Sequence, residues 1–100
     1  MAKAYWIARV DVHDDEAYKG YVAANAAAFK KYGAKFLVRG AKPDARLGTA
    51  RARNVVIEFA DLKTAVDCYE SAEYQHAIKV RGNSADVDMI IIEGYDGPQP

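Results

Sequence analysis

The sequence has little cysteine, little histidine and no long apolar run. Cys68 is the single cysteine of the 100 residues, so it cannot form a disulfide within the chain, which fits a reducing compartment. No segment approaches the roughly 20 apolar residues that span a bilayer, and the N-terminal residues lack the apolar core of a signal peptide. We therefore expect a cytoplasmic protein with no membrane partner.

An excess of one charge and the common cofactor motifs are also missing. Fourteen Lys and Arg residues balance fourteen Asp and Glu residues, which argues against a nucleic-acid partner. His13 and His76 have no second ligand at metal-binding spacing, the glycines are too scattered for a phosphate-binding loop, and no Ser–His or Cys–His pair is readable. We expect no metal and no other cofactor, so any catalysis would be cofactor-free.

What the sequence does contain is four short strand-like runs and two helical stretches. The first helix is expected from Asp14 or Asp15, which can cap free amides, to Gly33. The second starts at Asp61 and breaks near Ser71, which caps a further short helix. The strand-like runs cover residues 4–11, 35–40, 54–59 and 88–94.

The resulting order βαββαβ predicts an α+β fold of the ferredoxin-like type, with an antiparallel sheet in the strand order 4-1-3-2 and the helices on one face. We expect a single domain over residues 1–95 and a short C-terminal tail over residues 96–100.

Alternation along the strands assigns each residue to one face of the sheet. The face toward the helices is expected to carry Phe36, Val38, Val55, Ile57, Phe59, Ile90 and Ile92. The outer face then carries Tyr5, Ile7, Arg9, Lys35, Leu37, Arg39, Asn54, Val56, Glu58, Met89, Ile91 and Glu93. Because the outer face has an apolar middle and no helix to cover it, we expect a homodimer that buries it.

Several segments resemble a known family. The runs at residues 5–12, 21–40, 55–59, 71–75 and 90–97, together with Arg81, are similar to the domain-of-unknown-function family 1330 (DUF1330). The resemblance implies a ferredoxin-like fold that pairs into a dimeric α/β barrel, similar to cofactor-independent monooxygenases of antibiotic biosynthesis and to muconolactone isomerases. Ala34 and Ala72 stand where members often have a glycine and a proline, which affects turns more than chemistry.

The charged residues of the strands suggest where a ligand could bind. In an antiparallel sheet Arg9 and Arg39 should flank Asn54 at one end of the outer face, and guanidinium groups suit planar anions such as a carboxylate or an enolate. Tyr5, Lys35, Glu58 and Glu93 should gather at the other end. We predict that Arg9, Asn54 and Tyr5 bind a ligand and that Arg39 and Glu58 are catalytic, with Glu58 as a base of raised pKa.

Two residues outside the strands complete the predicted site. Asn25 interrupts the apolar stripe of the first helix and could reach a ligand, although an asparagine there is also explained by backbone hydrogen bonds. Arg81 continues the stripe of the last helix, although a cation at a helix C-terminus is also stabilising by itself. The leading interpretation is a pocket for a small organic acid or aromatic molecule, with isomerase or monooxygenase activity. The alternative is a non-catalytic interaction module whose sheet charges pair across the dimer.

Overall fold

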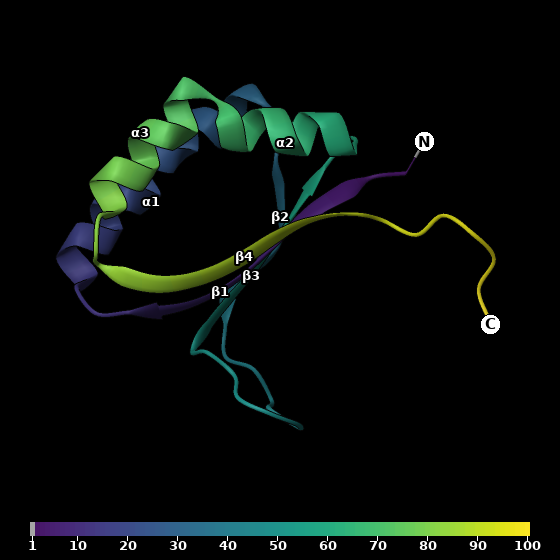
Figure 1. Ribbon diagram of the computed structural model, residues 1–100, viewed down its shortest axis with the longest axis horizontal. Helices are drawn as coiled ribbons and strands as arrows, with labels where there is room; N and C mark the ends of the chain where they lie inside the picture. Colours follow the sequence, from purple (N-terminus) through teal and green to yellow (C-terminus); the bar gives the residue numbers. More distant parts are fainter. Residues whose placement is uncertain (1) are drawn as a thin grey trace.

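The computed structural model describes residues 2–100 and has the predicted βαββαβ order. The elements are β1 Ala4–Val12, α1 Asp15–Lys31, β2 Lys35–Ala41, β3 Arg53–Phe59, α2 Leu62–Glu70, α3 Ala72–Arg81 and β4 Ala85–Glu93. The strands form one antiparallel sheet in the order β2-β3-β1-β4, which confirms the predicted order. Figure 1 shows all three helices on one side of the sheet, while the other side is uncovered.

Side-chain caps begin each helix where the sequence indicated. The carboxylates of Asp14 and Asp61 and the hydroxyl of Ser71 accept hydrogen bonds from the first-turn amides of α1, α2 and α3. Each such cap stabilises a helix by about 1 kcal/mol. Gly33, which follows α1, has a φ of 67°, a left-handed conformation that favours glycine. The predicted start and end of the first helix are therefore confirmed.

Trp6 of β1 is the centre of the core between the sheet and the helices. Its side chain is 2% exposed, and its ring packs edge-on against Phe29 of α1 and Tyr74 of α3. The indole Nε1 donates a hydrogen bond of 2.9 Å to the carbonyl oxygen of Ala65 in α2. One side chain thus joins the sheet to all three helices, and it fixes which face of β1 is the inner face.

The face predicted for β4 is wrong. Ile91 lies directly opposite Trp6, and residues opposite each other in a sheet point to the same side, so Ile91 faces the helices. Met89 also packs on the core, whereas Ile90 and Ile92 are 53% and 46% exposed on the outer face. All four residues are apolar, so alternation cannot tell which of them face the helices. The register with β1 settles this assignment.

The face predicted for the second half of β2 is also wrong. Phe36 lies opposite Ile57, but the register then shifts, and Arg39 lies opposite the buried Val55. Arg39 therefore belongs to the inner face, and Val38 changes to the outer face. An extra residue in one strand reverses the side of every residue that follows it, and strict alternation does not anticipate such a bulge.

Candidate functional site

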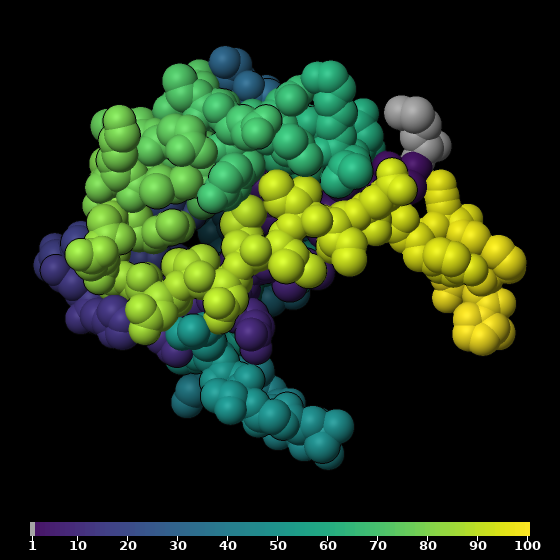
Figure 2. Space-filling view, viewed as in Figure 1, coloured from purple at the N-terminus to yellow at the C-terminus, as the bar shows by residue number. Residues whose placement is uncertain are grey.

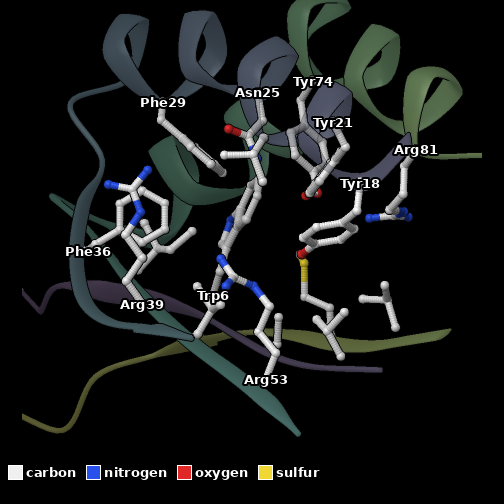
Figure 3. Close-up of a pocket in the computed structure, with 17 residues that line it drawn as sticks. Trp6, Tyr18, Tyr21, Asn25, Phe29, Phe36, Arg39, Arg53, Tyr74 and Arg81 are labelled. Atoms are coloured by element: carbon white, nitrogen blue, oxygen red, sulfur yellow. Dashed lines mark hydrogen bonds between the residues drawn. The ribbon is translucent and has the colours of Figure 1, made fainter. Parts of the chain in front are cut away.

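A cavity lies between the inner face of the sheet and helices α1 and α3 (Figure 3). It offers about 40 Å³ to the centres of water molecules, which is room for roughly three waters at 10–15 Å³ each. Most of its wall is apolar or aromatic, with Trp6, Phe29 and Phe36 on one side. Its polar part consists of the side chains of Asn25, Tyr18, Tyr21, Tyr74, Arg39, Arg53 and Arg81.

Three arginines reach the cavity from three different elements. Arg39 is the residue that the bulge of β2 turns inward, and Arg53 is the first residue of β3. Arg53 precedes Val55 by two residues, so Arg39 and Arg53 are diagonal neighbours on the same face, within reach of each other's long side chains. Arg81 ends α3 and points toward Tyr18 and Tyr21 in Figure 3.

Each of the three guanidinium groups lies over an aromatic ring. The Cζ atom of Arg39 is 4.1 Å from the ring centre of Phe36, that of Arg53 is 5.6 Å from Tyr18, and that of Arg81 is 5.0 Å from Tyr21. Such stacking uses the flat face of a guanidinium and leaves its N–H edges free. The arrangement therefore holds the three groups in place at the wall of the cavity.

The positive charge of the cavity has no negative counterpart among the residues that line it. No Asp or Glu is among the lining residues, and within residues 2–100 none of the three arginines forms an ion pair. Nε of Arg53 is buried and has no hydrogen-bond partner in the described part of the chain. Neighbouring like charges and an unpaired buried donor both cost free energy, which a bound anion would recover.

Tyrosine hydroxyls and one amide complete the polar wall. The hydroxyls of Tyr21 and Tyr74 are 2.6 Å apart and buried. Burial raises the pKa of Tyr74 strongly, with a further contribution from Tyr21, and burial also raises the pKa of Tyr18. The hydroxyls of Tyr74 and Tyr18 therefore stay protonated at neutral pH. Asn25, 7% exposed, projects into the same space from α1.

The structure divides the predicted site residues into two groups. Arg39, Asn25 and Arg81 line the cavity together. The other four predicted residues lie on the outer face of β1 and β3, where Arg9 is opposite Asn54 and Tyr5 is opposite Glu58. The two groups lie on opposite faces of the sheet, so they do not form the one site that the sequence suggested.

The outer-face residues have partners within their own chain. Arg9 donates to the Thr49 carbonyl oxygen at 3.4 Å and lies 3.8 Å from a carboxylate oxygen of Asp88. The amide of Asn54 donates to the carbonyl oxygen of Arg51 at 3.0 Å. The alternative interpretation of the strand charges was that they pair with other protein groups across a dimer. The partners seen here are protein groups, but they belong to the same chain.

Glu58 belongs to the other end of the outer face. Tyr5 and Lys35 flank it in the register, as predicted, and Nζ of Lys3 pairs with its carboxylate at 3.2 Å. Glu93 was expected in this cluster, but it lies opposite the buried Ala4 and therefore belongs to the other side of the sheet. The predicted catalytic role of Glu58 has no support from the cavity, which Glu58 does not line.

Arg53 is the charged site residue that the sequence interpretation missed. It stands immediately before the predicted strand, which was expected to begin at Asn54, while β3 begins at Arg53. Alternation with Val55 and Ile57 would have placed Arg53 on the helix side if the strand had been extended by one residue. That extension was the available signal.

Metal-ligand clusters and apolar helices of bilayer length are both absent from residues 2–100. No group of three or more His, Cys, Asp or Glu side chains is placed to hold a metal ion there. Likewise, no helix in that range is long and apolar enough to cross a bilayer.

Comparison with known proteins identifies the family. Residues 3–95 match the model of the domain of unknown function DUF1330. The chain belongs to this family. No curated protein matches the chain.

Solved structures show the same fold at low sequence identity. A protein of unknown function from Rhodopseudomonas palustris is 17% identical with a TM-score of 0.75, over 96% of this chain and 85% of that one. SnoaB, a cofactor-independent oxygenase from Streptomyces nogalater, is 13% identical with a TM-score of 0.60, over 100% of this chain and 97% of that one. An ethyl tert-butyl ether D (EthD) family protein from Bacillus halodurans is 14% identical with a TM-score of 0.57, over 95% of this chain and 100% of that one. The DUF1330 chain therefore shares its architecture with proteins that include an oxygenase.

Proposed function

We propose that this DUF1330 protein binds a small organic acid in the cavity between the sheet and helices α1 and α3. The observation that supports it is the set of three arginines, Arg39, Arg53 and Arg81, that line one cavity with no carboxylate beside them. Arginine forks bind planar anions through paired hydrogen bonds, and each such bond is roughly twice as strong as a neutral one. Asn25 and the tyrosine hydroxyls add donors around the anion.

Thermal melts with a matched pair of ligands test this binding. Benzoate and the neutral benzamide have the same ring and nearly the same shape, so they differ mainly in charge. Benzoate should raise the melting temperature, because a ligand at 100 times its Kd stabilises the folded state by about 2.7 kcal/mol. Benzamide should have little effect. Equal effects of the two compounds, or none from a panel of small acids, would contradict anion binding.

The activity that fits this site is cofactor-independent monooxygenation of the bound ligand. The similarity of fold to SnoaB, described as a cofactor-independent oxygenase, supports it. In such a reaction an electron-rich substrate reduces oxygen itself, and the protein holds the substrate and stabilises its negative charge. Oxygen uptake in the presence of electron-rich aromatic acids, with a chelator added to remove trace metal ions from the solution, tests the activity. A protein that binds these acids but consumes no oxygen is a ligand-binding protein instead.

We also propose that the working form is a homodimer joined through the outer face. Ile7, Leu37, Ile90 and Ile92 are exposed on that face, and Leu37 is 48% exposed. Figure 2 shows the surface hollowed between β4, the loop before β3 and the C-terminal residues. A second copy would bury these side chains. Each Å² of apolar surface removed from water contributes about 25 cal/mol of favourable free energy, which would drive dimerisation.

A further inference from the structure

The cavity offers cations and hydroxyl donors to a ligand, but no group that removes a proton. The β1 and β4 strands contribute no ionisable side chain to it. No carboxylate, imidazole, amine or thiol is among the lining residues. The ionisable groups that face the cavity are Tyr18 and Tyr21 of α1, Arg39 of β2, Arg53 of β3, and Tyr74 and Arg81 of α3.

Groups outside the lining do not supply the missing base. Cys68 is fully buried in α2 and does not line the cavity, and burial raises the pKa of its thiol to about 12. Glu58 lies on the outer face beside Lys3. Arginine stays protonated under all ordinary conditions. A ligand in this cavity therefore meets positive charge on several sides and no proton acceptor.

We propose that the cavity takes its ligand as a preformed aromatic anion, either a carboxylate or the ionised form of an acidic phenol, and exchanges no proton with it. This inference rests on the proposed function, and it adds the ionisation state of the ligand and the presence of an aromatic ring in it. The ring is inferred from the walls, where Trp6, Phe29 and Phe36 offer flat apolar surface next to the guanidinium edges.

The proposal restricts the chemistry of the site. A reaction that begins with removal of a carbon-bound proton by the protein, as in many isomerisations, lacks its base here. Oxygenation of an ionised phenol does not need one, because a ring carbon that carries hydrogen adds O2 to give a peroxide anion, whose O–O bond then breaks to leave a carbonyl at that carbon and release hydroxide. The pH dependence of binding should follow the ionisation of the ligand and should stay flat above the pKa of the free ligand until Tyr18 and Tyr74 titrate.

A coloured phenol tests the ionisation state directly. The ionised form of 4-nitrophenol absorbs visible light and the neutral form does not, so a pH titration with excess protein reports the pKa of the bound phenol. An opposite charge within hydrogen-bonding range lowers such a pKa by about 1–3 units, which is a roughly ten- to thousandfold preference for the anion. Arg53→Met should remove most of that preference. Arg9→Met, which changes an arginine of the outer face, should leave it unchanged.

The outcomes separate this inference from the proposed function. If benzoate stabilises the protein but bound 4-nitrophenol keeps its ordinary pKa, has a raised pKa or does not bind, the inference is overturned and acid binding stands. If neither compound binds, the proposed function fails as well. If Arg9→Met changes the bound pKa as much as Arg53→Met, the anion lies on the outer face and both ideas fail.

Discussion

Gly40 is where one small substitution should separate the anion site from the stability of the fold. It lies within the second register shift of β2, between Arg39 and Ala41, with a φ of 86°, and a methyl group there would overlap Nη1 of Arg53 and lie 2.9 Å from its Cζ. The absence of a side chain thus makes room for the guanidinium of Arg53 beside Arg39. We expect Gly40→Ala to displace Arg53 from the cavity.

The size of the effect follows from three terms, two of which lower the stability of the fold and one of which weakens ligand binding. An alanine at positive φ costs about 1–2 kcal/mol of folding free energy. The overlapping atom is the far end of a flexible side chain, so Arg53 can move away for about 0.5–1.5 kcal/mol more. The affinity loss is one charge-assisted hydrogen bond, about 1.5–3 kcal/mol, or roughly 10- to 150-fold in Kd. Stability should therefore fall moderately, while affinity for benzoate falls steeply.

Gly33→Ala is the matched control. Gly33 has a φ of 67°, and no atom lies within 4 Å of the position that its methyl group would take. It should show the strain cost without any loss of benzoate affinity. Urea unfolding and calorimetric binding measure the two quantities for each variant. In the Arg53→Met background, Gly40→Ala should no longer change the affinity.

Two results would refute this reasoning. Wild-type affinity in Gly40→Ala would mean that Arg53 does not need the space at Gly40 to serve the ligand. An equal loss of affinity in Gly33→Ala would mean that general backbone strain, and not the displaced guanidinium, weakens binding.

Three further predictions concern the two faces of the sheet and the core. Arg39→Met should change the free energy of unfolding by less than about 1 kcal/mol, since only an exposed cation–π contact is lost. The same change should abolish stabilisation by benzoate. A loss of about 3 kcal/mol in urea unfolding would instead reveal a buried carboxylate left without its partner. Ile90→Glu should yield a folded monomer in light scattering, whereas Ile91→Glu should unfold the chain, because Ile91 packs on the core; a monomeric wild type at micromolar concentration would contradict the dimer. The pKa of the Cys68 thiol rises on folding from 9.0 to about 12, so the unfolded state loses its proton first and stability should fall as the pH rises from about 9 toward 12. Urea unfolding of Cys68→Ala should show a smaller decline over this pH range. An unchanged decline in the variant would exclude Cys68 as a cause.

The sequence predicts the fold well because its signals are local and agree with one another. Caps at Asp14, Asp61 and Ser71 mark the helix starts, and a βαββαβ order leaves few sheet topologies. Alternation also places β1 and β3 correctly, because each mixes apolar and polar residues, as at Trp6 and Glu58. Local patterns of this kind do not depend on what a strand pairs with.

The site is less predictable because it depends on register. Alternation assigns Arg39 to the outer face, and only the pairing of β2 with β3 reveals the extra residue that turns it inward. The same limit applies to Ile90 and Ile91, whose neighbours are equally apolar. Arg53 was missed through a strand boundary that differed by one residue, and boundaries are the least certain part of any pattern-based prediction.

The irregularity of β2 therefore joins the fold to the proposed function. A regular strand would place Arg39 on the outer face opposite Asn54, with Arg9 on the other side of Asn54 and Asp88 already close to Arg9 as a counter-charge. The bulge instead brings Arg39 to the cavity beside Arg53, an arrangement that costs free energy in the absence of a ligand because like charges are neighbours. Since β2 is an edge strand, it can accept a bulge without disturbing a second partner strand. A costly charge pair held by a local backbone irregularity, next to a cavity, is more readily explained by a ligand than by the needs of folding.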